Sequence, residues 1–160
     1  MKKVNLILIL LLLFISLGIV SCHKEDKQNE SNFISSNINE VKWNGIPKIQ
    51  TNEDNDTIIL IGSGNEQVIV FKIKFKGEGN YTLENSQAKY YTTFGGDVMT
   101  SLYTLDASSS SQITITEYNS EQNILKGNFE LILLQEWSNP ENNVNKLIFK
   151  NGGFKVTIDD

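Results

Sequence analysis

Residues 67–76 read Gln67-Val68-Ile69-Val70-Phe71-Lys72-Ile73-Lys74-Phe75-Lys76, and this stretch decides the fold class. Apolar side chains occupy every second position from Ile69 to Phe75, and lysines occupy the alternate positions from Lys72 to Lys76. Successive side chains of a β-strand point to opposite faces, so a period of two is typical of a strand with one buried and one solvated face. The stretch therefore predicts a half-buried β-strand.

The same period recurs along the chain after residue 32. Turn-forming residues separate the segments, for example at Asn44-Gly45 and at Asn151-Gly152-Gly153. No segment there has the 3.6-residue period of a convincing amphipathic helix. Roughly ten short strands are typical of all-β folds, so we expect a single antiparallel β-sandwich or barrel-like domain behind a flexible tether. The other candidate strands are residues 33–38, 41–43, 46–50, 57–61, 81–83, 88–93, 98–105, 112–118, 128–137, 146–150 and 154–158.

The composition excludes several classes of protein. The chain has 160 residues, a net charge of −5, one Cys and one His, and all 14 of its basic residues are Lys. An acidic chain without Arg is a poor nucleic-acid binder, because that binding depends largely on neutralising phosphates. One Cys and one His cannot form an internal disulfide or a Cys/His zinc site. We therefore expect no nucleic-acid partner, no metal and no cofactor.

The first 21 residues have the organisation of a bacterial secretion signal. Lys2 and Lys3 precede an apolar run at residues 6–20, which is shorter than the ~20 residues that a membrane-spanning helix needs. The run ends in Ile19-Val20-Ser21-Cys22, which resembles the lipobox of bacterial lipoproteins. The resemblance implies that a signal peptidase recognises Ile19, Val20 and Ser21, cuts after Ser21 and leaves a lipidated Cys22. An uncleaved signal anchor and an ordinary signal peptide cut nearby are the alternatives.

Residues 22–32 are expected to form a polar tether between the lipidated Cys22 and a domain at residues 33–160. Residues 23–32 contain no apolar side chain, so they cannot contribute to a core. Lys24-Glu25-Asp26 resembles the export signal that follows the lipidated Cys in Bacteroidota lipoproteins. It implies an outer-membrane protein that faces the cell surface; a tether without sorting information, on the periplasmic face, is the alternative. His23, the only His, is interpreted as a tether residue.

Short motifs stand at strand-like positions of the domain. They are Asn39-Glu40-Val41-Lys42-Trp43, Gly79-Asn80-Tyr81-Thr82-Leu83, Ile113-Thr114-Ile115-Thr116, Gly127-Asn128-Phe129 and Asn151-Gly152-Gly153-Phe154. Together they resemble a family of Bacteroidota outer-membrane and surface lipoproteins of unknown function, although Glu40 stands where that family usually has Gly. The resemblance implies a single all-β domain behind a lipid anchor and no activity. Its glycines are expected in turns and its aromatic residues in the core.

Two polar clusters are candidate binding sites. The oxygen-rich run Asn52-Glu53-Asp54-Asn55-Asp56 could hold Ca²⁺, but it lacks the central Gly and distal Glu of the calcium loop, so we expect a solvated turn there and no metal site. Lys72, Lys74 and Lys76 form a basic stripe that could contact an anionic glycan or a lipid head group. We expect instead a solvated strand face whose lysines protect a sheet edge from pairing, with the binding stripe as the alternative.

Aromatic and acidic side chains are the remaining candidates. No His lies in the domain and no thiol stays free after lipidation, which argues against a Ser-His-Asp or Cys-His triad. A glycosidase needs only two carboxylates, which Glu117, Glu130, Glu136 and Asp97 could supply. The aromatic residues that could stack on sugar rings, with core packing as the default, are Trp43, Tyr90, Tyr91, Phe94, Tyr103 and Trp137.

These features predict a lipid-anchored envelope lipoprotein without catalytic residues. Its membrane contact is the lipid on Cys22, and its domain is expected to be a binding or accessory module for a glycan or an envelope protein. A surface-coat or spacer lipoprotein without a specific ligand is the first alternative, and a carboxylate-based hydrolase is the second. An exposed aromatic patch or a lined cleft favours the binding module, a uniformly polar surface favours the spacer, and two close acids favour the hydrolase.

Overall fold

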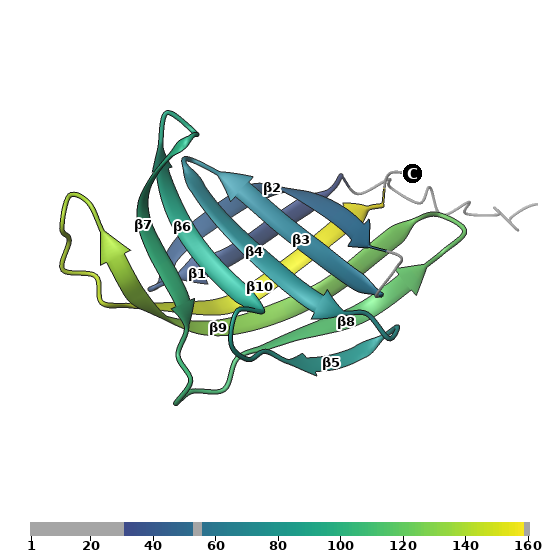
Figure 1. Ribbon diagram of the computed structural model, residues 1–160. Helices are drawn as coiled ribbons and strands as arrows, with labels where there is room; N and C mark the ends of the chain where they lie inside the picture. Colours follow the sequence, from purple (N-terminus) through teal and green to yellow (C-terminus); the bar gives the residue numbers. More distant parts are fainter. Residues whose placement is uncertain (1–30, 53–55, 159–160) are drawn as a thin grey trace, which may run out of the picture. The chain divides into compact units, whose positions relative to one another are not determined.

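The computed structural model describes residues 31–52 and 56–158, which form ten β-strands and no helix (Figure 1). The prediction of an all-β domain is therefore confirmed. Within these residues no helix is long and apolar enough to cross a membrane. The strands are β1 (Phe33–Ile38), β2 (Val41–Asn52), β3 (Thr57–Gly64), β4 (Gln67–Lys74), β5 (Gly79–Thr82), β6 (Ala88–Phe94), β7 (Val98–Leu105), β8 (Gln112–Asn119), β9 (Ile124–Ser138) and β10 (Lys146–Thr157).

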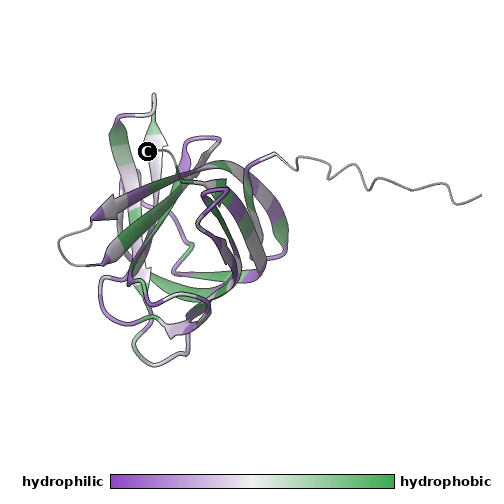
Figure 2. Ribbon diagram, turned by 90° about the vertical axis from the view of Figure 1, so that its right-hand side faces the viewer, coloured by the Kyte–Doolittle hydropathy of each residue, from purple (hydrophilic) through white to green (hydrophobic). Residues whose placement is uncertain are grey.

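The ten strands form one antiparallel sheet that closes on itself. Neighbouring strands follow the order β10-β1-β2-β3-β4-β6-β7-β9-β8-β5, and β10 also pairs with β9. Eight strands, from β10 through β1 and β4 to β9, therefore form a closed ring, and β8 and β5 continue the sheet to one side of β9. Figure 2 shows the strands arranged around a common interior. Of the two predicted architectures, the barrel-like one is observed.

Strand β9 joins three neighbours and is the longest strand, with 15 residues. On one edge its first half, residues 124–130, pairs with β8, and its second half, residues 133–138, pairs with β7. Its other edge pairs with β10. The closure of the ring therefore depends on β9.

Two segments predicted as turns lie inside strands instead. Asn44-Gly45 is part of β2, and Asn151-Gly152-Gly153 is part of β10. In β10 the register with β9 shifts between Phe149 and Gly152, and Asn151 has a φ of 52°. This is a β-bulge, which needs a residue in the left-handed region just as many turns do. The prediction of turns at these two segments is therefore wrong, because the chain does not reverse at either of them.

The alternation at residues 67–76 places β4 as the sequence predicts. Ile69, Phe71 and Ile73 are buried in the interior, whereas Lys72 and Lys74 are exposed on the outer face. The interpretation of these lysines as protection of a sheet edge is wrong, because β4 pairs with β3 on one side and with β6 on the other. Lys72 and Lys74 therefore lie on a solvated face within the sheet and not at its edge.

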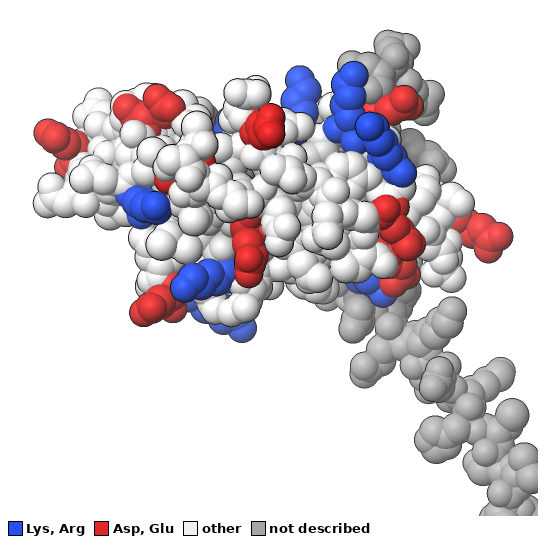
Figure 3. All heavy atoms as spheres, turned by 90° about the horizontal axis from the view of Figure 1, so that it is seen from below, with Lys and Arg blue, Asp and Glu red and all other residues white. Residues whose placement is uncertain are grey.

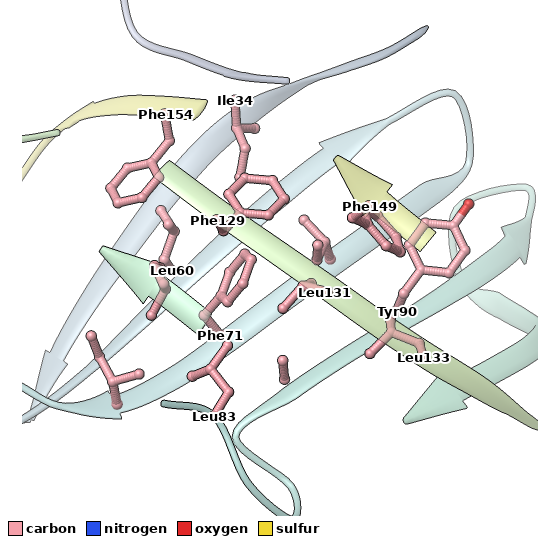
Figure 4. Close-up of a cluster of buried hydrophobic side chains, with 14 of the residues drawn as sticks. Ile34, Leu60, Phe71, Leu83, Tyr90, Phe129, Leu131, Leu133, Phe149 and Phe154 are labelled. Carbon is pink, nitrogen blue, oxygen red and sulfur yellow. The ribbon is translucent and has the colours of Figure 1, made fainter. Parts of the chain in front are cut away.

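Aliphatic and aromatic side chains together fill the interior of the ring of strands (Figure 4). The rings of Phe71 and Phe129 have centroids 5.0 Å apart, and Tyr90 packs edge-on against Phe149 at 5.5 Å. All four side chains are at most 5% exposed. These separations are typical of favourable aromatic pairs, which add stability to the burial of their apolar area.

Two phenylalanine rings lie over two glycines in β9 and β10. The register pairs Phe129 with Gly152 and Gly127 with Phe154. A Cβ on Gly152 would lie 2.5 Å from Phe129 Cδ2, and a Cβ on Gly127 would lie 2.6 Å from Phe154 Cζ. The glycines leave the space that the rings occupy, as in designed sheets where an aromatic ring covers a glycine. The expectation that these two glycines form turns is therefore wrong.

Candidate functional site

A groove on the outer face of β8, β9 and β10 is the candidate binding site, with a volume of about 540 Å³. The strand register places Thr114 beside Asn128, Asn128 beside Gly153, and Gln112 beside Glu130. The site is thus assembled from three strands that follow one another in the sequence. Its lining residues are Gln112, Thr114, Asn128, Phe129, Glu130, Asn151, Gly152 and Gly153.

The groove is hollow because β10 carries two consecutive glycines at the bulge. A Cβ on Gly153 would have no neighbour closer than 3.8 Å, the nearest being Asn128 Oδ1 and Phe33 Cε2. A Cβ on Gly152 would instead meet Phe129, a core residue. No side chain of β10 therefore covers the space beside Asn128.

Polar groups line the groove and are available to a ligand. Thr114 Oγ1 donates a hydrogen bond to Asn80 Oδ1 of β5 at 2.6 Å, which fixes the position of the hydroxyl. Within the described part of the chain, the side chains of Gln112, Asn128 and Glu130 make no hydrogen bond. Two amides and one carboxylate can therefore donate to and accept from a polyhydroxylated ligand.

An aromatic ring stands at the rim of the groove. Phe33, the first residue of β1, is 40% exposed, and its ring approaches the open side of Gly153. Sequence reasoning missed Phe33, because it was counted only as part of a candidate strand. The sequence did contain a signal for Phe33: it is a large apolar residue at the first position of its strand. A side chain at that position lies at one end of the closed ring of strands.

The structure separates the aromatic residues that the sequence proposed for stacking on sugars. Trp43, Tyr90 and Tyr103 are core residues, and burial together with the nearby Tyr103 raises the pKa of Tyr90. Trp43 Nε1 donates a hydrogen bond to the Gly64 carbonyl at 3.2 Å. The other three reach the surface of β6 and β9: Tyr91 is partly exposed, and Phe94 and Trp137 are 72% and 41% exposed. None of the six lines the groove.

The candidate carboxylates do not come together in the groove. Only Glu130 lines it. Glu117 forms an ion pair with Lys126 at 3.0 Å, and Glu136 accepts a hydrogen bond from Thr104. Asp97 is exposed at the hairpin between β6 and β7. The groove therefore offers a single carboxylate rather than the facing pair that a glycosidase uses.

Several of the predicted sites fall on residues outside the described ranges. They are the signal recognition residues Ile19, Val20 and Ser21, the lipidation site Cys22, the export signal Lys24, Glu25 and Asp26, and Glu53, Asp54 and Asn55 of the calcium candidate. Among residues 31–52 and 56–158, no group of three or more His, Cys, Asp and Glu side chains is arranged to hold a metal ion.

Of the three lysines of the predicted basic stripe, two belong to strand β4 and the third does not. Lys72 and Lys74 lie on the outer face of β4, whereas Lys76 lies beyond the end of that strand. The Lys76 backbone N–H donates a hydrogen bond to the Tyr81 hydroxyl at 2.9 Å, which ties the segment after β4 to β5. The stripe is on a different face of the ring from the groove.

A second depression, of about 310 Å³, adjoins the loop at residues 106–111. Four of the six residues of this loop are serines, yet its two ends, Asp106 and Ser111, are buried. The Asp106 carboxylate accepts hydrogen bonds from the hydroxyls of Ser108 and Ser109 at 2.6 and 2.8 Å, and from the Ser108 N–H at 2.9 Å. Lys146 Nζ lies 3.4 Å from it. The carboxylate therefore holds the loop closed and is not free for a ligand.

Replacement of Asp106 with asparagine is expected to lower the melting temperature at neutral pH by several degrees. The hydrogen bonds from Ser108 and Ser109 hold the pKa of Asp106 well below its ordinary value of 3.8. A depressed pKa adds stability above the ordinary pKa, and this stability is lost as the pH falls from about 4 toward the folded-state pKa. The difference between wild type and D106N should therefore shrink below pH 4 in a thermal melt series.

The matched control is Asp97→Asn, since Asp97 is exposed and accepts none of these loop hydrogen bonds. Its melting temperature should follow that of the wild type across the same pH range. A difference between wild type and D106N that stays constant from neutral to acid pH would contradict the role given to Asp106.

Comparison with known proteins assigns the chain to a family for which no activity is known. Residues 30–156 match the family described as Domain of unknown function (DUF6252), which covers all ten strands apart from the last residue of β10. No curated protein and no solved structure matched the chain. The match spans most of the 160 residues, and the chain therefore belongs to the DUF6252 family of domains of unknown function.

Proposed function

We propose that this chain is a lipid-anchored lipoprotein of the bacterial cell envelope whose domain binds a glycan without catalysing a reaction. The groove on β8, β9 and β10 carries this proposal. It combines unengaged amide and carboxylate groups from Gln112, Asn128 and Glu130 with the exposed ring of Phe33. Sugars present hydroxyl groups and flat apolar ring faces, so they need this combination of polar partners and an aromatic surface.

Support for the lipid anchor comes from the N-terminal sequence. Lys2, Lys3 and the apolar run before Ile19-Val20-Ser21-Cys22 have the charge, the length and the small residue before Cys that a lipoprotein signal requires. Several acyl chains on Cys22 would give stable anchoring, which a single chain does not. Lys24-Glu25-Asp26 supports placement on the outer face of the outer membrane, in a Bacteroidota type of envelope.

A single carboxylate in the groove favours binding over hydrolysis. A glycosidase needs a second carboxylate within ~5–10 Å of the first, and Glu130 is the one acidic residue among the groove-lining residues. The proposed role of Glu130 is to accept hydrogen bonds from sugar hydroxyls. Charged acceptors form stronger hydrogen bonds than neutral ones, so Glu130 also determines the orientation of the ligand.

The proposal is tested on an array of bacterial and host oligosaccharides with the protein and two groove variants. Gly153→Val is expected to abolish binding, because its side chain would fill the open space beside Asn128. Asn128→Ala is expected to weaken binding by about threefold to tenfold, the effect of one hydrogen bond. Because Gly153 is outward-facing and uncrowded, the valine variant should fold as well as the wild type.

The control variant is Asn44→Ala, which removes an exposed amide from the outer face of β2 and leaves the groove intact. It should bind the array as the wild type does. Absence of binding to every oligosaccharide would contradict a glycan ligand and favour the spacer alternative. Equal binding by G153V and wild type would place any glycan site outside the groove.

A further inference from the structure

The outer face of β2, β3, β4 and β6 has an unusual charge distribution, and we call it the basic face. These four strands contain five lysines and no acidic residue, although residues 31–160 as a whole contain ten lysines and 16 acidic residues. By contrast, β8 and β9 contain three glutamates and one lysine. Seen from below, one group of lysines stands together at one edge of the molecule, and other lysines lie at the opposite edge (Figure 3). The five lysines are Lys42, Lys48, Lys72, Lys74 and Lys89.

A row of apolar side chains begins on β4 and β6 of the basic face and continues beyond it onto β7 and β9. The strand register places Val68 beside Tyr91, Tyr91 beside Leu102, and Leu102 beside Trp137, so one row crosses from β4 to β9. The first three are partly exposed and Trp137 is 41% exposed. Lys89 Nζ lies 5.9 Å from the centroid of the Tyr91 ring. Contiguous apolar surface of this kind, rimmed by charge, is typical of an interaction surface.

The basic face and the groove lie on opposite sides of the ring. In the closed order, β4 is separated from β10 by β3, β2 and β1 in one direction and by β6, β7 and β9 in the other. Strand β4 carries Lys72 and Lys74, and β10 carries the glycines of the groove. A surface that contacts the basic face would therefore leave the groove turned away from it.

We propose that the basic face docks onto an anionic lipid surface, namely that of the membrane in which the protein is anchored. This proposal rests on the lipid anchor proposed above. The first argument is charge complementarity: an acidic domain is repelled by anionic headgroups unless it presents a face without acidic residues. The second is the chemistry of the row, because Trp and Tyr favour the interface between headgroups and acyl chains, and Lys can extend its amine to the phosphates.

The length of the chain before the domain also supports docking of the basic face onto the membrane. Phe33 comes eleven residues after Cys22, and a fully extended chain of eleven residue steps reaches about 36–40 Å. A flexible chain of this length spans only about 20 Å on average. The lipid on Cys22 would therefore hold the domain close enough for repeated contact with the bilayer, which raises the effective concentration of the headgroups. A second copy of the chain is disfavoured, because two basic faces would bring like charges together.

The test uses the full protein purified from membranes and reconstituted in vesicles that contain brominated acyl chains, which quench tryptophan on contact. In vesicles with phosphatidylglycerol we expect quenching of Trp137, whereas Trp43 is 4% exposed and should remain unaffected. The variant Trp137→Phe assigns the signal. Quenching should be weak in pure phosphatidylcholine, and it should fall when salt screens the headgroups.

Charge reversal on the basic face should release the domain. Each Lys beside an anionic surface contributes about fivefold to binding, so Lys48→Glu with Lys72→Glu should lower the docking equilibrium constant by about 30-fold or more. The control, Lys126→Glu with Lys150→Glu, makes the same change in net charge on β10 and at the end of β9 opposite to Trp137. Its Trp137 quenching should match that of the wild type.

Three results of the vesicle experiments would overturn the proposal. They are an absence of Trp137 quenching, equal quenching in the two kinds of vesicle, and equal losses in the two double variants. Protection of Trp137 by an envelope protein in place of lipid would also overturn it, since the basic face would then bind protein. Mass analysis of the purified chain reports the lipid on Cys22, and the oligosaccharide array reports the groove, so failure of the proposed function is seen separately.

Discussion

Gly127→Ala is expected to lower the free energy of unfolding by about 3 kcal/mol or more, which is a large part of the ~5–15 kcal/mol of a typical domain. A Cβ at this position would lie 2.2 Å from the Thr114 carbonyl oxygen and 2.6 Å from the Phe154 ring. The carbonyl belongs to the backbone of β8 and cannot rotate away. Relief of the contact would have to separate β8 from β9 or move Phe154, one of the most deeply buried residues. Urea unfolding followed by circular dichroism measures the effect.

Gly153→Ala is the matched control, because it makes the same chemical change on the strand that pairs with β9. No atom lies within 3.8 Å of the added Cβ, so there is no collision to relieve. The substitution should leave the stability unchanged or raise it by up to about 1 kcal/mol, since alanine restricts the unfolded chain more than glycine does. Equal stabilities for the two alanine variants would contradict the close packing of Gly127 against β8.

Cys22→Ala is expected to abolish incorporation of a labelled fatty acid into the protein in cells. The lipid is attached through a thiolate, and alanine offers no nucleophile. The chain should then accumulate at the mass of the uncleaved precursor, because the peptidase requires the modified Cys. The loss should be complete rather than partial, since Cys22 is the only Cys in the sequence. Metabolic labelling followed by gel fluorography checks this result.

The control for the anchor is Ser21→Gly, which keeps a small residue before Cys22 and should keep the label. Protease added to intact cells tests the orientation with the same material. A domain on the outer face should be degraded in wild-type cells, and one on the periplasmic face should be protected. Labelling that persists in the C22A variant would contradict lipidation at this residue.

The local pattern of the sequence was sufficient to predict the strands. Lys72 and Lys74 alternate with Ile69, Phe71 and Ile73, and the structure places the two sets on opposite faces of β4. This works because the side-chain period of a strand is a local property of the backbone. The sequence pattern did not distinguish a closed ring from a sandwich, since both have the same alternation of side chains along each strand.

Glycine and asparagine misled the sequence interpretation in β2 and β10. Gly45, Gly127 and Gly152 look like turn residues, yet each lies in a strand beside a large ring: Trp43, Phe154 and Phe129 respectively. A tight turn needs glycine, and so does a strand position that must leave room for a neighbouring aromatic ring, so glycine alone does not distinguish the two. For Gly127 and Gly152 the difference depends on which strand lies alongside, and that information is not local, whereas Gly45 lies beside Trp43 of its own strand.

The groove could be predicted only in part for the same reason. Glu130 was a candidate from the sequence, and its alternation with Phe129 indicates an outward side chain. Thr114, Asn128 and Gly153 become neighbours only through the pairing of β8 with β9 and of β9 with β10. No pattern within one segment contains that register.

The pairing of β10 with both β1 and β9 has a consequence for the order of events during synthesis. The first and last strands are neighbours, so the ring cannot close until residues 146–157 are available. A chain exported as we propose would thread through the inner membrane with its N-terminus leading, and β10 would be the last strand to emerge. Premature folding in the cytoplasm would be slow, because contacts between distant segments form late. The topology therefore suits a protein that must stay unfolded until translocation is complete.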